Sequence, residues 1–399
     1  MARALADEAN QRLVDRLIAE GALWSPALIA AFRATPRHRF LDRLFQFRQE
    51  ENAWHEVLLR DPRTEELRQI YADRALITHV STPGRDSPGV PISSSSQPSL
   101  MAQMLEDLAV SAGKKTLEVG AGTGYNAALL AHVAGPGQVI SIDVDRNVLS
   151  EAWDHLRAFA ERDVTLAHAD GREGYAEAAP YDRIMVTAAT PDLEPAWLEQ
   201  LSPDGILLAP LAQAPGLAFV ACGRVVQGVF EGQLTRPAYF MPLRDEGTTG
   251  PGDADGPRAP LAAETAPSPW SGWFDRRRPR ASWLGFIQAL AFYGWLSGLT
   301  VHCQSLGTGE PSYGVSQDQT VCWFGIQQWQ VSGSEGKALG RRLWRAFLEA
   351  GGPRPTEYAL WAQPADQPFR GPDTGFRRVG ARCRQAWRIK AERERPAWC

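Results

Sequence analysis

One turn constrains the fold more than any other part of the 399-residue sequence. The segment Leu117-Glu118-Val119 is typical of a strand, and it leads directly into Gly120-Ala121-Gly122-Thr123-Gly124. Glycine is needed where φ is positive or where a ligand approaches the backbone closely. A helical pattern follows from Tyr125 to Val133, and the N–H groups at its start are free to bind an anion. This order predicts a ligand site at the end of a strand.

Apolar segments that fit strands alternate with helical patterns from about Lys114 to Arg244. Such alternation is typical of a parallel sheet covered by helices. We therefore predict a Rossmann-like, doubly wound α/β sheet. The expected strands cover residues 116–119, 138–143, 164–168, 181–187 and 205–210, and the expected helices cover residues 125–133, 146–159 and 195–201.

The remaining sequence divides around this α/β domain, which we assign to residues 76–244. Residues 1–75 are predicted as an N-terminal helical segment. Residues 245–281 are rich in Gly and Pro and lack apolar periodicity, which predicts a flexible linker. Residues 282–399 are expected to form a smaller α+β domain that takes part in substrate recognition, with an amphipathic helix over residues 337–350.

Tryptophan is concentrated in the C-terminal part, where 10 of the 14 Trp residues lie after residue 269. Large aromatic side chains suit a buried core, and Trp is also enriched at surfaces where a protein binds a peptide partner. Both interpretations stay open. On the second, Trp270, Trp273 and Trp283, near the linker, help to bind or enclose a substrate.

Composition excludes several classes of partner. The net charge of −4, from 46 acidic and 42 basic residues, gives no electrostatic reason to expect a nucleic acid. No apolar run approaches the roughly 20 residues of a membrane span, and the N-terminus is too polar for a signal peptide. The five Cys residues form no CxxC pair or metal-binding cluster, so we expect no metal and a reducing, cytoplasmic location.

Two further acidic residues follow expected strands. Asp143 ends the second strand, 19 residues after Gly124, where a carboxylate can accept hydrogen bonds from both ribose hydroxyls of a ligand. Asp170-Gly171 ends the third strand, where the turn can meet an adenine edge. A dinucleotide fingerprint would need glycine in place of Tyr125. The form E-x-G-x-G-x-G is instead that of S-adenosylmethionine-dependent methyltransferases. The residues predicted to bind this cofactor are Glu118, Gly120, Gly122, Gly124, Asp143, Asp170 and Gly171.

Several longer segments match one family of methyltransferases. Asp170-Gly171-Arg172-Glu173-Gly174 and the stretch from Ala179 to Ala189 closely resemble the protein-L-isoaspartate O-methyltransferase family. The matching segments occur in the family's order from about residue 30 to 245. The other matching segments are Pro36-Arg37-His38-Arg39-Phe40, Tyr71-Ala72-Asp73-Arg74-Ala75-Leu76, Ser96-Gln97-Pro98, Leu201-Ser202-Pro203-Asp204-Gly205 and Phe240-Met241-Pro242-Leu243.

The resemblance implies a carboxylate nucleophile, which is already ionised at neutral pH and needs no general base. The enzyme's task is then to align a carboxylate oxygen with the methyl group in a dry site. The family's substrate-binding segment, commonly Thr-x-Ser before Gln-Pro or Ala-Pro, corresponds here to Ser94-Ser95-Ser96-Gln97-Pro98. Ser96 matches the family's active-site serine, and we assign Ser96 and Ser95 as catalytic candidates. A helix N-cap is the alternative role of this segment.

The sequence departs from the repair enzymes at Ile77-Thr78-His79-Val80, in the run Ser93–Ser96 and in the added C-terminal domain. These features resemble a subgroup that tailors ribosomally synthesised peptides such as lanthipeptides, lasso peptides and graspetides. That resemblance implies methylation of an Asp side chain in a cyclised precursor peptide, which leads to aspartimide or isoaspartate. Repair of isoaspartyl residues in damaged proteins is the alternative. A cofactor-binding module without catalysis is a third hypothesis.

Overall fold

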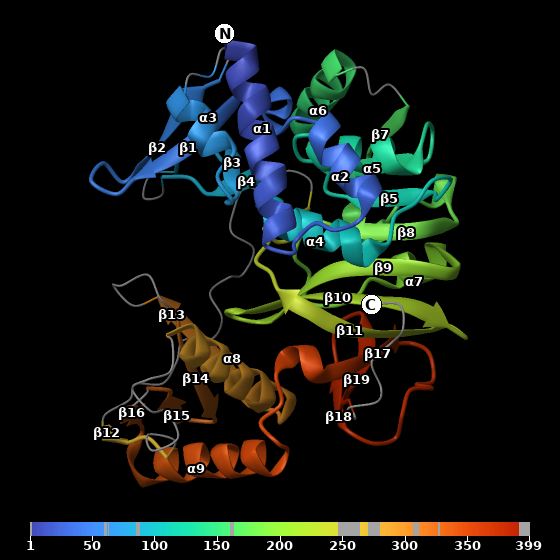
Figure 1. Cartoon of the computed structure of the whole chain (residues 1–399). Coiled ribbons are helices and arrows are strands. Elements are labelled where there is room, and N and C mark those ends of the chain that lie inside the picture. Colours follow the sequence, from blue (N-terminus) through green and yellow to red (C-terminus); the bar gives the residue numbers. More distant parts are fainter. Residues whose placement is uncertain are drawn as a thin grey trace.

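The computed structural model describes residues 2–59, 62, 64–84, 88–159, 163–245, 264–269, 280–305, 311–325 and 328–390. Its centre is one ten-stranded sheet (Figure 1). In chain order the strands of this sheet are β5 (Thr116–Val119), β6 (Val139–Asp143), β7 (Val164–His168), β8 (Tyr181–Val186), β9 (Leu201–Ala214), β10 (Leu217–Val226), β11 (Val229–Pro237), β17 (Tyr358–Pro364), β18 (Phe376–Val379) and β19 (Cys383–Ile389). Their spatial order is β18-β19-β17-β11-β10-β9-β8-β5-β6-β7.

The five strands from β5 to β9 pair in parallel, and the chain order reverses at β5, which lies between β6 and β8. Helices α5 (Tyr125–Ala134), α6 (Arg146–Phe159) and α7 (Pro195–Gln200) connect these strands. The predicted doubly wound α/β fold is therefore confirmed. A reversal of strand order opens a crevice at the carboxyl ends of the strands, which is where α/β folds bind ligands.

Each face of the sheet carries its own hydrophobic layer, because side chains alternate along a strand. Met185 belongs to one layer and its neighbour Ile184 to the other. The first layer is covered by the N-terminal helices α1 (Ala2–Ala19), α2 (Pro26–Ala34) and α4 (Pro98–Leu108). The second is covered by α7 and by a C-terminal helix, α8 (Arg280–Leu296).

The N-terminal segment is less helical than the sequence predicts. Besides α1, α2 and α3 (Thr64–Ile70), it contains an antiparallel hairpin of β1 (Arg43–Arg48) and β2 (Ala53–Leu58). Residues 43–48 do not show the strict alternation of a half-buried strand, since Leu44 and Phe45 are both apolar, so the sequence contains no clear strand signal there. A second antiparallel pair follows, formed by β3 (Leu76–Val80) and β4 (Pro91–Ser95).

The C-terminal region contains a separate five-stranded antiparallel sheet with the order β12-β16-β15-β14-β13. One of its strands lies inside the predicted linker, because residues 264–267 pair with residues 328–331. Trp270 and Trp273 lie outside the described residues. The elements of this region are β12 (Glu264–Pro267), α8, β13 (Thr300–Ser305), β14 (Pro311–Gln317), β15 (Thr320–Trp323), β16 (Gln328–Val331) and α9 (Gly333–Glu349).

The last strands of the chain do not belong to that small sheet. Strand β17 pairs antiparallel with β11, and β19 and β18 extend the central sheet beyond it. The hydrophobic core is also shared, since Phe292 of α8 contacts Phe219 of β10 with ring centroids 5.5 Å apart. Trp283 is half-buried against Phe286. The buried tryptophans of this region, which support the core interpretation, are Trp295, Trp323, Trp329, Trp344 and Trp387.

Candidate functional site

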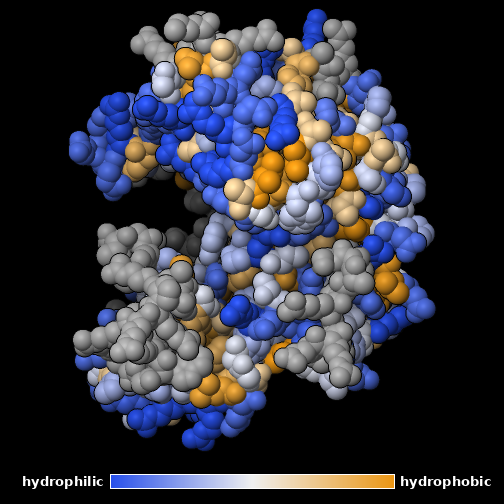
Figure 2. All heavy atoms as spheres, viewed as in Figure 1, coloured by the Kyte–Doolittle hydropathy of each residue, from blue (hydrophilic) through white to orange (hydrophobic). Residues whose placement is uncertain are grey.

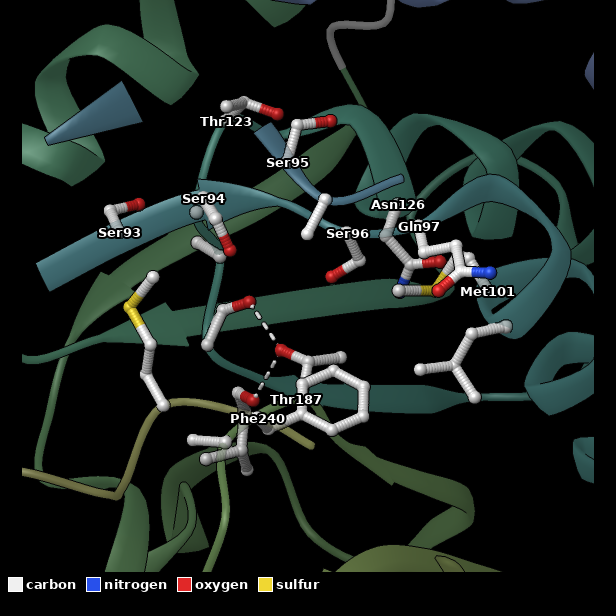
Figure 3. Close-up of a pocket in the computed structure, with 18 of the residues that line it drawn as sticks. Ser93, Ser94, Ser95, Ser96, Gln97, Met101, Thr123, Asn126, Thr187 and Phe240 are labelled. Atoms are coloured by element: carbon white, nitrogen blue, oxygen red, sulfur yellow. Dashed lines mark hydrogen bonds between the residues drawn. The ribbon is translucent and has the colours of Figure 1, made fainter. Parts of the chain in front are cut away.

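A cavity of about 740 Å³ lies at the carboxyl ends of β5, β6 and β8. This volume is within the usual range for small-molecule sites. The residues that line it come mainly from the glycine turn after β5, from β4 and the start of α4, and from residues 236–244 at the end of β11 and beyond it. Thr187, which follows β8, is bound to the start of the glycine turn, because its hydroxyl donates to the carbonyls of Val119 (3.0 Å) and Gly120 (2.9 Å) (Figure 3).

The glycine turn has the backbone that the sequence predicts. Gly120 has φ +101°, and a Cβ there would lie 2.5 Å from Oγ1 of Thr187. Gly120 and Gly122 line the cavity. Gly124, also a predicted cofactor residue, instead lies where α5 begins, and a Cβ there would lie 3.2 Å from the carbonyl oxygen of Ala152 in α6. The absence of a side chain at Gly124 therefore allows α5 to pack closely against α6.

Asp143 ends β6 and presents a half-buried carboxylate to the cavity. The backbone N–H groups of Gly122 (3.2 Å) and Asp145 (3.1 Å) donate to it and fix its orientation. Burial raises the pKa of this carboxyl, while these hydrogen bonds oppose the rise. A fixed carboxylate acceptor beside the glycine turn fits the ribose hydroxyls of S-adenosylmethionine.

Glu118 lies at the floor of the cavity and is fully buried. Both of its oxygens already accept hydrogen bonds, one from Asn126 Nδ2 (2.6 Å) and one from Ser141 Oγ (2.5 Å). Burial raises the pKa of Glu118 to about 7. Glu118, a predicted cofactor residue, is thus bound to side chains of α5 and β6. Its hydrogen bonds connect these two elements beneath the glycine turn.

The turn after β7 contributes Gly171 to the cavity, but not Asp170 among the lining residues. The Asp170 carboxylate accepts from the backbone N–H (2.9 Å) and Nη1 (3.0 Å) of Arg172. Gly171 is tightly enclosed, since a Cβ there would lie 2.6 Å from Val119 and 2.7 Å from Leu243. Asp170 therefore shapes the turn that carries Gly171.

The serine segment forms the wall opposite Thr187, and its hydroxyls alternate along the strand (Figure 3). Ser94 and Ser96 direct their hydroxyls into the cavity, whereas the hydroxyls of Ser93 and Ser95 point away from it. All four serines are among the lining residues, but of the two predicted as catalytic only Ser96 directs its hydroxyl into the cavity. Ser95 is buried, and its hydroxyl accepts from Nε of Arg37 (3.1 Å). Sequence analysis missed Ser94, which the two-residue period of β4 would have identified.

Arg37 holds the serine segment from behind. It is fully buried, and its Nε donates to Oγ of Ser95 (3.1 Å). Its Nη2 donates to the carbonyls of Ser95 (3.0 Å) and Ser96 (2.8 Å), and its Nη1 to that of Ile70 (2.7 Å). Burial lowers the pKa of Arg37 to about 10, so it remains charged at neutral pH. The Pro36-Arg37 motif was the sequence signal for this residue.

The third wall, residues 236–244, is mostly apolar. Phe240, Met241 and Leu243 line the cavity, which keeps water away from groups bound there. Arg244 also lines it and donates from Nη2 to the carbonyl of Ile92 in β4 (2.8 Å). The polar groups of the cavity are thus hydroxyls, carboxylates, side-chain amides and the two cations Arg236 and Arg244, beside an apolar surface.

Two absences apply to the described residues only. They contain no group of three or more His, Cys, Asp or Glu side chains placed to hold a metal ion. None of their helices is long and apolar enough to cross a membrane.

Comparisons with known proteins agree with this site. Residues 8–248 match the family model of protein-L-isoaspartate(D-aspartate) O-methyltransferase. A protein-L-isoaspartate O-methyltransferase of Ignicoccus hospitalis is 31% identical over 244 residues, which are 60% of this chain and 99% of that relative. One of Azorhizobium caulinodans is 45% identical over 116 residues, 29% of this chain and about half (52%) of the relative.

A solved structure named protein-L-isoaspartate O-methyltransferase has the same fold, with a TM-score of 0.52 and 20% identity. The match covers 88% of this chain and 96% of that one, so it extends beyond residues 8–248 into the C-terminal region. The family model alone covers more than half of the chain. This chain belongs to the protein-L-isoaspartate(D-aspartate) O-methyltransferase family of S-adenosylmethionine-dependent carboxyl O-methyltransferases.

Proposed function

We propose that the protein methylates an isoaspartyl carboxylate in a peptide or protein. The observation that carries this proposal is the pair of hydroxyls, Ser94 and Ser96, that face the cavity across from Thr187 and the glycine turn (Figure 3). The relatives of Ignicoccus and Azorhizobium, named protein-L-isoaspartate O-methyltransferases, support it.

The residues suit a carboxylate nucleophile. A carboxyl of ordinary pKa is ionised at neutral pH, so the site needs no base. Ser94 and Ser96 can donate hydrogen bonds to one carboxylate oxygen and leave the other free to react. S-adenosylmethionine, held by Asp143 and the glycine turn, supplies the methyl group when bound. Phe240 and Met241 exclude the water that would solvate the carboxylate.

A second candidate is methylation of an ordinary Asp in a cyclised precursor peptide, with aspartimide or isoaspartate as the later product. The run Ser93–Ser96 favours it, since the repair enzymes commonly have Thr-x-Ser there. The C-terminal region favours neither candidate, because a structure named protein-L-isoaspartate O-methyltransferase matches 88% of this chain.

Transfer of a radiolabelled methyl group to three peptides of one sequence tests the proposal. The peptides contain isoaspartate, aspartate, or aspartate within a macrocycle. We expect turnover of the isoaspartyl peptide. Turnover of the macrocycle alone would replace the proposal with the second candidate. S-adenosylmethionine binding without methyl transfer to any of the three would favour a cofactor-binding module.

Matched serine variants connect this activity to the cavity. Ser96→Ala removes a hydroxyl that faces the cavity, and we expect kcat/KM for the accepted peptide to fall about 10-fold. Ser93→Ala, in the adjoining strand β4, removes a hydroxyl that points away from the cavity and should change kcat/KM less than twofold. Equal effects of the two variants would contradict the assignment of Ser96.

A further inference from the structure

Tyr239 links the C-terminal region to the cavity. All of the lining residues precede residue 245, so no described residue of the C-terminal region lines the cavity itself. Tyr239 is one of the lining residues, next to Phe240, and 62% of it is exposed. Figure 2 shows a notch at the edge of the molecule, below the N-terminal region to which β1 to β4 belong in Figure 1.

The hydroxyl of Tyr239 is fixed in spite of this exposure. It donates to the carbonyl of Gly216 (2.9 Å), in the turn between β9 and β10, and accepts from Nε2 of Gln288 in α8 (3.3 Å). Tyr313 of β14 donates to the same carbonyl (2.7 Å) and lies 3.4 Å from the Tyr239 hydroxyl. Two of these partners, Gln288 and Tyr313, belong to the C-terminal region, so that region determines where the ring lies.

The turn at Gly216 leaves little freedom for this arrangement to shift. Gly216 has φ +70°, and a Cβ there would lie 2.6 Å from Sγ of Cys303 and 2.8 Å from the ring of Tyr313. The Tyr313 ring is fully buried. The exposed ring of Tyr239 is therefore held at its hydroxyl end by Gly216 and by the buried Gln288 and Tyr313, while most of its surface stays open to solvent.

We propose that Tyr239 is a specificity-determining residue, which binds an apolar or aromatic side chain next to the methylated carboxylate of the peptide. The C-terminal region acts through Gln288 and Tyr313, which position the ring. This inference rests on the proposed function for its peptide substrate. A large aromatic ring fixed at its polar end loses little conformational entropy when it binds an apolar group.

The test uses two isoaspartyl peptides that differ only in having Phe or Gly next to the isoaspartate. Their Kd values are measured calorimetrically on the full-length protein with S-adenosylhomocysteine present, and their KM and kcat values in the methyl-transfer assay. For Tyr239→Ala we expect Kd and KM for the Phe peptide to rise about 10-fold. The values for the Gly peptide and the Kd of S-adenosylhomocysteine should change less than twofold.

Two further variants separate a positioning role from a general loss of structure. Tyr313→Phe keeps the buried ring and removes only its hydroxyl, and we expect it to weaken the Phe peptide about threefold, with the Gly peptide unaffected. Trp153→Ala removes another exposed aromatic residue, 48% exposed on α6 and absent from the cavity lining, and should change neither peptide.

Equal losses for both peptides, an unchanged Kd for the Phe peptide in Tyr239→Ala, or no binding of either peptide to the wild type would overturn the inference. Because Kd is measured without turnover, the two proposals can fail separately. Selective binding that depends on Tyr239 without methyl transfer would contradict the proposed function and support the role of Tyr239. Methyl transfer with no effect of Tyr239→Ala would do the reverse.

Discussion

The catalytic region before residue 245 and the described C-terminal region after residue 263 differ in the kinds of side chain that they bury. The catalytic region buries charged side chains, whereas none of the buried residues described after residue 263 is Asp, Glu, Lys or Arg. The largest fully buried side chains there are aromatic: Tyr313, Trp329, Tyr358 and Trp387. The buried Arg, Asp and Glu residues of the catalytic region are Arg37, Glu118, Arg183, Asp192 and Glu194.

This difference suggests that the region before residue 245 forms the cavity, whereas the C-terminal region stabilises it from outside. A buried charge is stable only where hydrogen bonds replace its hydration, so each one fixes the groups around it. Arg37 and Glu118 fix two walls of the cavity in this way. The aromatic C-terminal region contributes apolar contact area, and it positions backbone and side-chain groups of the catalytic region. Three predictions test this division.

The largest expected effect is on stability, at Asp192. This buried carboxylate lies in the catalytic region, but it accepts from the backbone N–H groups of Arg382 (3.1 Å) and Cys383 (2.8 Å) and from Gln385 Nε2 (2.7 Å). Asp192→Ala leaves these donors unpaired, and we expect the free energy of unfolding in urea to fall by about 3 to 5 kcal/mol.

Cofactor affinity should not change with Asp192→Ala, because the contact supports the fold and lies outside the cavity lining. The matched control is Asp182→Ala, which removes a more exposed carboxylate that accepts from the backbone N–H of Lys115 (3.0 Å). We expect this control to cost about 1 kcal/mol. A loss of cofactor affinity in Asp192→Ala would break the proposed division between the regions.

The second prediction concerns pH. The pKa of Glu118 rises from 4.5 to about 7 on folding because the carboxyl is buried. Between these values the unfolded chain is ionised at this position while the folded one keeps its proton. The stabilising contribution is thus complete below pH 4.5 and is lost as the pH rises toward 7. We expect the free energy of unfolding to fall by about 2 to 3 kcal/mol over this range.

Glu118→Gln keeps the shape of the side chain and removes its titration, so urea titrations of this variant should show most of that slope abolished. An unchanged slope in Glu118→Gln would assign the pH dependence to another part of the molecule.

The smallest of the three effects is expected at Arg37. Lysine keeps the charge but lacks the planar set of donors that binds several carbonyls at once. With Arg37→Lys we expect kcat for the accepted peptide to fall about 10-fold, because Ser96 is no longer held in place. The Kd of S-adenosylmethionine should stay within twofold.

Arg183→Lys is the matched control, since Arg183 is also buried and donates to the carbonyls of Ala109 and Asp182, away from the serine segment. It should lower stability without lowering kcat. A comparable loss of kcat in both variants would mean that burial of any arginine, and not the contact with the serines, supports turnover.

The same two regions differ in how well the sequence predicts them. The bounds of β5, α6 and β7 agree with the predicted residues 116–119, 146–159 and 164–168, because local periodicity and turn residues determine short parallel strands and their helices. The pairing of β17 with β11 joins segments more than 100 residues apart, and no local pattern encodes it. Similarly, β12 becomes a strand only because β16 lies beside it.

The candidate site was predictable where residue type and position in a motif suffice. Asp143, Gly120, Gly122 and Gly171 lie at the cavity as expected. Asp170 does not, because a carboxylate two residues before an arginine N–H can instead cap its own turn. Ser94 follows from the two-residue period of the serine segment once Ser96 is placed at the cavity, but the uniform run of four serines does not by itself show which pair of hydroxyls faces inward.

The pairing of β11 with β17 has a consequence for the order in which the protein forms during synthesis. When the ribosome has made the catalytic region up to Arg244, β11 is an open edge strand, and its partner is still more than 100 residues from being synthesised. Unpaired edges are sites where nascent chains associate with one another. The enzyme therefore has every residue of its cavity well before it has a closed sheet, and the end of the chain completes the fold.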